Sequence, residues 1–138
     1  MAKIQELKTK EQLKEGFEVL KELRPHLNFK KFLEMIKETP NYRLFGIFEN
    51  KQIVCVAGIG IKTNLYFGKH LWVYDLITKS TERSKGYGKQ MMESLEELAR
   101  KEKCEKIALS SGFQRLDAHK FYESLSMRKT SFVFLKEL

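Results

Sequence analysis

Hydrophobic and polar positions follow two periods along this chain, and each change of period predicts a new element. Apolar residues recur three or four positions apart in a helix and every second position in a half-buried strand. Helical spacing occurs in four segments, which begin near Thr9, Asn28, Tyr87 and Asp117. Strand-like patterns occupy six short segments: Ile4–Leu7, Tyr42–Glu49, Ile53–Ile61, Leu71–Ile77, Lys106–Ser110 and Thr130–Leu135.

Polar residues at the ends of these segments support the boundaries. Thr9 and Gln12 have the spacing of a capping box, and Asn28 is a favoured residue for a helix N-cap. Asp117 is expected to cap the last helix in the same way. Asn50 follows one strand-like segment and precedes the next, which predicts a tight hairpin turn.

The order of the elements predicts the fold class. Three consecutive strands favour an antiparallel meander, and the strand–helix–strand connection after Leu71 favours a parallel pair. The chain is therefore expected to be an α/β (α+β) protein. Its mixed central sheet would have about six to seven strands, with helices on both faces. A chain of 138 residues suits one domain over residues 1–138.

One loop combines features of an anion-binding site. It lies between the strand-like run that ends at Ile77 and the helix expected from Tyr87, and it contains two glycines. Glycine lets the backbone turn tightly, and the first amides of a helix have no intrahelical partner. Such amides, with the positive end of the helix dipole, suit a phosphate. The residues expected to bind it are Arg83, Ser84, Lys85, Gly86, Tyr87, Gly88 and Lys89.

Composition narrows the class of partner. The formal net charge of +8 indicates either an anionic partner or merely solvated lysines. Interleaved glutamates argue against a nucleic-acid-binding stripe, and no apolar run approaches the ~18 residues that span a bilayer. Three histidines and two distant cysteines form no metal-binding pattern. We therefore expect a protein that binds no metal. The sequence shows no secretory leader, so we also expect a cytoplasmic protein.

Two motifs in this order resemble a known family. Arg83-x-x-Gly86-x-Gly88 follows a strand-like run, and Ala118-His119-Lys120-Phe121-Tyr122-Glu123-Ser124-Leu125 lies downstream. Together they resemble the acyl-CoA loop and the late helix of the GCN5-related N-acetyltransferases (GNAT). The family usually has a glycine after this helix, where the chain has Ser126, so that turn must be made differently. The family's asparagine before the helix is also absent, and Gln114 and Asp117 are the nearest matches.

The resemblance implies an activity and assigns roles to residues. Acetyl-CoA would be the acetyl donor, and its pyrophosphate would lie on residues 83–89. The main chain of Leu76, Ile77 and Thr78 would pair with the pantetheine arm, and Asp117 would contact the cofactor. Tyr122 would be the general acid that protonates the leaving thiolate. Asp75 would be the first candidate for the general base, and Glu82 a weaker one.

Alternatives remain open at each of these positions. Asp75 is interpreted equally well as a polar residue that points off the core or pairs with a lysine. For Tyr122 the alternative is an aromatic that packs its helix against the sheet, and the acid role is favoured because Phe121 is able to do that packing. The leading hypothesis is an N-acetyltransferase acting on a primary amine of a small molecule or peptide. A catalytically weak acyl-CoA-binding or sensor module is the alternative. The basic segment Lys21–Tyr42 favours amines that also carry a carboxylate or phosphate. Residues 132–134 belong either to the core or to a homodimer interface.

Overall fold

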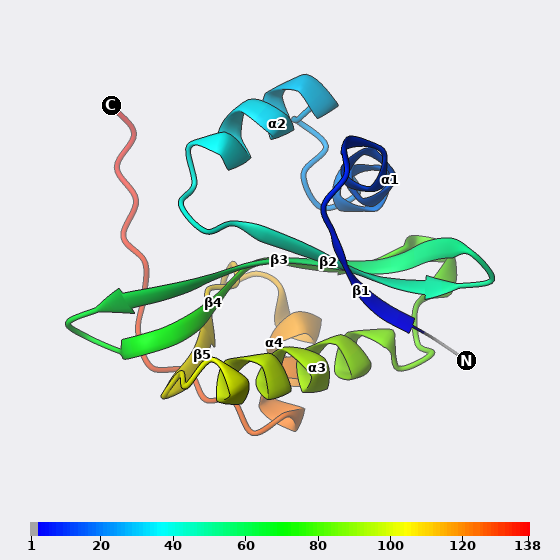
Figure 1. The fold of residues 1–138 in the computed structure, drawn as a ribbon. Helices are drawn as coiled ribbons and strands as arrows, with labels where there is room; N and C mark the ends of the chain where they lie inside the picture. The colour runs from blue at the N-terminus through cyan, green and yellow to red at the C-terminus, as the bar shows by residue number, and fades with distance from the viewer. Residues whose placement is uncertain (1–2) are drawn as a thin grey trace. The chain divides into compact units, whose positions relative to one another are not determined.

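The computed structural model describes residues 3–138, which form two compact units, residues 3–108 and 109–138 (Figure 1). The order of elements in the first unit follows the predicted one. The expectation of a single domain over residues 1–138 stays a prediction. The first unit contains β1 (Lys3–Leu7), α1 (Lys10–Leu20), α2 (Phe29–Lys37), β2 (Arg43–Glu49), β3 (Gln52–Asn64), β4 (Gly68–Thr78), a 3₁₀ turn (Ser80–Glu82) and α3 (Tyr87–Lys101). β5 (Lys106–Leu109) runs across the junction, and α4 (Leu116–Ser124) belongs to the second unit.

A five-stranded mixed sheet with strand order β1-β2-β3-β4-β5 forms the centre of the fold. β1 to β4 pair antiparallel, with Leu7 opposite Leu44 and Val56 opposite Ile77. The predicted α/β class with a mixed sheet is confirmed, and the strand count is corrected from six or seven to five. Residues 130–135 carry a strand-like pattern but form no strand in the described chain. A strand needs a partner edge, and an alternating sequence does not supply one.

The predicted caps of the first two helices are confirmed. The Thr9 hydroxyl accepts a hydrogen bond from the Gln12 amide at 3.1 Å, and Gln12 Oε1 accepts one from the Thr9 amide at 3.2 Å. Asn28 Oδ1 accepts a hydrogen bond from the Lys31 amide at 2.8 Å. These side chains satisfy amides that a helix cannot pair internally, so both helix starts are fixed locally.

The sheet is covered by helices on both faces in the first unit. α1 and α2 lie on one face and α3 lies on the other (Figure 1). Phe17 and Phe32 pack with ring centroids 5.1 Å apart on the first face, while Met91 and Leu95 of α3 are fully buried. Burial of this apolar surface is the main force that holds the helices against the sheet.

The second unit contains α4 and the C-terminal segment. α4 begins after Arg115, and no side-chain cap bond is found there within the described chain. The prediction that Asp117 caps this helix is therefore wrong. Asp117 lies within the first turn, where its carboxylate still interacts favourably with the helix dipole.

A serine makes the turn that ends α4. Ser126 adopts φ 66°, and the Met127 and Ser126 amides donate to the carbonyls of Tyr122 and Glu123, each at 3.1 Å. This is a Schellman arrangement, whose left-handed residue is usually glycine. The departure noted in the sequence is thus accommodated by a serine in the left-handed region. No helix in the part of the chain that the structure describes is long and apolar enough to cross a bilayer.

Candidate active site

The loop between β4 and α3 has the backbone geometry that its glycines predicted. Gly86 is the N-cap of α3 with φ 85° and ψ 11°, a left-handed conformation that disfavours any side chain. The first hydrogen bond of the helix runs from the Gln90 amide to the Gly86 carbonyl at 3.0 Å. The amides of Tyr87, Gly88 and Lys89 therefore precede the intrahelical ladder. A Cβ at Gly86 would meet nothing within 4 Å, so the space above the loop is open.

Charged side chains around this loop already have partners. Lys85 Nζ lies 3.0 Å from Glu82 Oε1, and this hydrogen bond raises the pKa of Lys85 and lowers that of Glu82. Arg83 Nε donates to the Thr78 carbonyl at 3.2 Å, which ties the loop back to the end of β4. Lys89 is exposed on the first turn of α3. The backbone amides and the Lys89 side chain are thus the groups of the loop that are most available to bind an anion.

Tyr87 has a structural contact in addition to its place in the loop. Its hydroxyl donates to Glu49 Oε2 at 3.2 Å, which connects the start of α3 to the end of β2. Burial and this hydrogen bond raise the pKa of Tyr87. We therefore expect its backbone amide, rather than its phenol, to be available to a ligand.

A β-bulge in β4 shapes the second part of the site. Gly58 lies opposite Asp75 and Ile59 lies opposite Val73, so Tyr74 is the extra residue of the bulge. Successive residues of a regular strand face opposite sides, but a bulge breaks this alternation. Tyr74 and Asp75 consequently both line one pocket. The strand after the bulge resumes regular pairing with β3, from Leu76 to Thr78.

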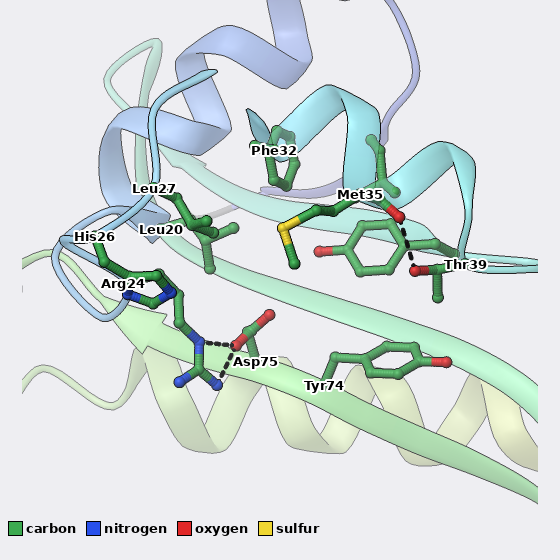
Figure 2. A pocket seen from close by; sticks show the side chains of 11 residues that line it. Leu20, Arg24, His26, Leu27, Phe32, Met35, Thr39, Tyr74 and Asp75 are labelled. Carbon is green, nitrogen blue, oxygen red and sulfur yellow. Dashed lines mark hydrogen bonds and ion pairs between the residues drawn. The ribbon is translucent and has the colours of Figure 1, made fainter. Parts of the chain in front are cut away.

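The pocket is a cavity of about 320 Å³ between β4 and the region of α1 and α2 (Figure 2). Its walls are mostly apolar, and Asp75 supplies the only carboxylate among its lining residues. The lining residues are Leu20, Arg24, His26, Leu27, Phe32, Met35, Ile36, Thr39, Tyr42, Tyr74 and Asp75.

Asp75 forms an ion pair with Arg24 in this pocket. Arg24 Nε and Nη2 approach the same oxygen, Oδ1, at 2.7 and 2.6 Å. The other oxygen, Oδ2, receives no hydrogen bond from the described residues and points into the pocket (Figure 2). The Asp75 side chain is 14% exposed and that of Arg24 is 42% exposed, so the arginine lies nearer the solvent. The cation that pairs with Asp75 is thus Arg24 and not the expected lysine, and the catalytic role of Asp75 stays a prediction.

Two tyrosines close the other side of the pocket. The rings of Tyr42 and Tyr74 have centroids 5.6 Å apart, and a Cβ on Gly58 would overlap the Tyr42 hydroxyl. Burial, and secondarily the negative charge of Asp75, raise the pKa of Tyr42, so its hydroxyl stays neutral. Gly58 therefore makes room for a polar but uncharged group on the pocket wall.

Tyr122 lies on α4, in the second unit. Burial raises its pKa, while the positive charge of Arg115 lowers it by a smaller amount. Its ring contacts that of Phe121 at a centroid distance of 5.3 Å. Tyr122 is thus a neutral phenol at physiological pH, the state that a proton donor requires.

Comparison with known proteins establishes the family. The acetyltransferase (GNAT) family model matches residues 5–127. This chain belongs to the GNAT acetyltransferase family. It is similar to the uncharacterized N-acetyltransferase YhdJ of Bacillus subtilis (strain 168), with 34% identity over 140 residues, covering 99% of each chain.

Solved structures agree on the fold of this GNAT protein. It is similar to the aminoglycoside N-acetyltransferase AAC(6')-Iy in complex with CoA, with a TM-score of 0.87 and 14% identity, covering 100% of this chain and 95% of that one. It is also similar to a transcriptional regulator from Bacillus halodurans C-125, with a TM-score of 0.85 and 22% identity, covering 100% of both chains. At such identities these likenesses establish the fold alone.

Sequence reasoning missed two pocket residues of this GNAT protein. Arg24 was noted only as part of a basic segment, and Tyr42 only as the start of a strand. Gly58 and Gly60 were a usable signal, because glycine inside a strand often marks close approach by another group. Within residues 3–138, no cluster of three His, Cys, Asp or Glu side chains suits a metal ion.

Proposed function

We propose that this GNAT acetyltransferase transfers an acetyl group from acetyl-CoA to a primary amine of a small molecule or peptide. The observation that carries the proposal is the left-handed Gly86 at the N-terminus of α3, directly after β4. This geometry presents unpaired amides and the positive end of a helix dipole to open space. Family membership over residues 5–127 agrees with it.

The residues present fit such a donor. The amides of residues 84–89 would hold the pyrophosphate, with Lys89 as the cation nearest to them along the helix. The main chain of Leu76, Ile77 and Thr78 would bind the pantetheine arm by hydrogen bonds of the kind that a sheet edge makes. AAC(6')-Iy, which shares the fold, was solved in complex with CoA. Asp117 remains a proposed contact to the donor from the start of α4.

Two side chains would handle the protons of the transfer. Acetyl-CoA supplies a thioester, and during the transfer the amine nitrogen bonds to the acyl carbon, the C–S bond breaks, the amine loses a proton and the thiolate gains one. Asp75 presents Oδ2 to the pocket and would receive the amine's proton, directly or through a water. Tyr122, kept neutral by burial, would donate a proton to the thiolate.

A thiol-release assay with acetyl-CoA against a panel of amines tests the activity, and calorimetry tests donor binding separately. We expect heat from acetyl-CoA binding and amine-dependent thiol release. Folded protein that binds no CoA thioester would refute the proposal.

The acyl-CoA-binding module is the second candidate, and it is favoured by the ion pair that engages the proposed base. Tyr122→Phe distinguishes the two, because catalysis should fall about 10²-fold or more while acetyl-CoA affinity holds. Tyr66→Phe in the exposed β3–β4 turn is the matched control. Donor binding without thiol release for any amine would favour the module.

A further inference from the structure

The pocket holds one opposite-charge pair in otherwise mostly apolar surroundings. Arg24 and Asp75 face each other there with N–O distances of 2.6 and 2.7 Å. Leu20 and Phe32 are among the most buried residues of the lining, at 1% and 3% exposure. A ligand of this pocket therefore contacts an ion pair that carries no net charge, together with an apolar surface.

This pairing disfavours an acceptor that carries only positive charge. A simple alkylammonium that approaches Asp75 must share the carboxylate with Arg24 and lies beside a like charge. An acceptor that brings its own carboxylate supplies Arg24 with a second partner. Arginine binds carboxylates well, because its planar donors match the two oxygens of the anion.

We propose that the acceptor is an amino acid, a primary amine with an adjacent carboxylate and an apolar or aromatic side chain. The proposal rests on the acetyl transfer proposed above and names the substrate class of the same site. Arg24 is the specificity-determining residue. The ammonium binds Asp75 Oδ2, the carboxylate binds the Arg24 guanidinium, and the two opposite-charge contacts replace part of the internal ion pair.

The exposure of the two charged side chains sets the orientation of the acceptor. Arg24 is 42% exposed and Asp75 is 14% exposed, so the carboxylate lies toward the mouth and the amine lies deeper. The acceptor's side chain then lies among the apolar residues of the lining. Met35 projects into this space and is flexible enough to adjust to side chains of different shape (Figure 2).

The acidic groups of the lining favour the same class. The exposed residues of α2 give no clear preference, because Lys30, Lys31 and Lys37 are exposed together with Glu34 and the following Glu38. Asp75 is the only lining carboxylate, whereas an acceptor with several ammonium groups needs several acidic partners.

The experiment compares matched pairs of acceptors that differ only in the carboxylate. L-leucine is compared with 3-methylbutylamine, and L-phenylalanine with 2-phenylethylamine, by thiol release at saturating acetyl-CoA. We expect kcat/KM of the wild-type protein to be about tenfold or more higher for the amino acid of each pair. In Arg24→Gln this preference should fall to within about twofold, through a higher KM for the amino acid. Arg24→Lys, which keeps the charge, should retain part of the preference.

Lys21→Gln is the control variant. Lys21 lies three residues from Arg24 on the same segment, pairs with Glu18 at 2.7 Å and does not line the pocket. Lys21→Gln removes one positive charge, as Arg24→Gln does, but it changes no contact in the pocket. The acceptor preference should therefore be unchanged in this variant. An equal loss in both variants would mean that net charge, rather than the Arg24 contact, sets the preference, and the inference would be wrong.

Wild-type protein alone decides the main question, so the test does not depend on the stability of the variants. If each plain amine reacts as well as its amino acid, the inference is refuted while the proposed transfer stands. If no amine of any class releases thiol, the proposed function fails. Calorimetric titration of the same pairs into the protein then still tests the pocket, and equal affinities within a pair would overturn the inference.

Discussion

Replacement of Gly86 by alanine should separate ligand binding from folding. Gly86 has φ 85°, and an added Cβ would meet no atom within 4 Å. The substitution therefore lowers the free energy of unfolding only through backbone strain, because a left-handed conformation costs an L-residue about 1–2 kcal/mol. For a chain of 138 residues that cost corresponds to a decrease of about 3–7 °C in Tm.

The effect on acetyl-CoA binding should be larger than this loss of stability implies. The open space above Gly86 is where the pyrophosphate would approach the amides, so a methyl group there meets the ligand. Relaxation of the backbone toward a negative φ would also turn these amides away. We expect the Kd for acetyl-CoA, measured by calorimetry well below the Tm, to rise about tenfold or more, which corresponds to ~1.4 kcal/mol.

Gly68→Ala is the matched control. Gly68 has φ 74°, so it carries the same backbone penalty, and its Cβ would press only on the movable Glu105 carboxylate. It lies at the start of β4, about 30 Å along the strand from Thr78, which precedes the loop. Both variants should lose similar stability, and only Gly86→Ala should lose affinity. If Gly86→Ala binds acetyl-CoA within twofold of wild type, the loop is not the pyrophosphate site.

Three further predictions follow from backbone geometry and pKa shifts. Because burial raises the pKa of Tyr122 above its ordinary value of about 10, the acid form persists through neutral pH. In a pH–kcat profile the decrease due to Tyr122 should lie above pH ~10 and vanish in Tyr122→Phe, and a Tyr122-dependent decrease below pH ~9 would contradict this assignment. Ser126→Gly should raise the Tm by relieving φ 66°, a gain of up to about 1 kcal/mol, and thermal unfolding at equal or lower Tm would contradict the strain. Burial raises the pKa of Cys55 to about 11, so a thiol reagent should modify the partly exposed Cys104 first and Cys55 only after denaturation.

Features that depend on near neighbours in sequence could be predicted. The Thr9 capping box, the Asn28 cap and the left-handed glycine before α3 follow from local sterics and from the unpaired amides of a helix end. Asp117 shows the limit of such reasoning. The N-cap of α4 is Arg115, two residues before Asp117, and local preference does not fix a helix boundary to within one or two residues.

The C-terminal segment shows a second limit. Residues 130–135 alternate like a strand, yet they form none in the described chain, and Phe132 and Phe134 are 87% and 96% exposed. A sequence specifies that a segment is able to pair. Whether it does pair depends on a free edge, and a free edge is a property of the assembled sheet.

The sequence by itself determined the family, the order of the elements in the first unit and the backbone of the loop before α3, because each follows from patterns of residues that are close together along the chain. Only the tertiary structure decided the chemistry of the acceptor pocket. The bulge at Tyr74 turned two successive residues toward one cavity, and the fold brought Arg24 onto Asp75 across 51 positions of sequence. A contact over that separation depends on the path of the whole chain, which no local pattern of hydrophobic and polar residues encodes.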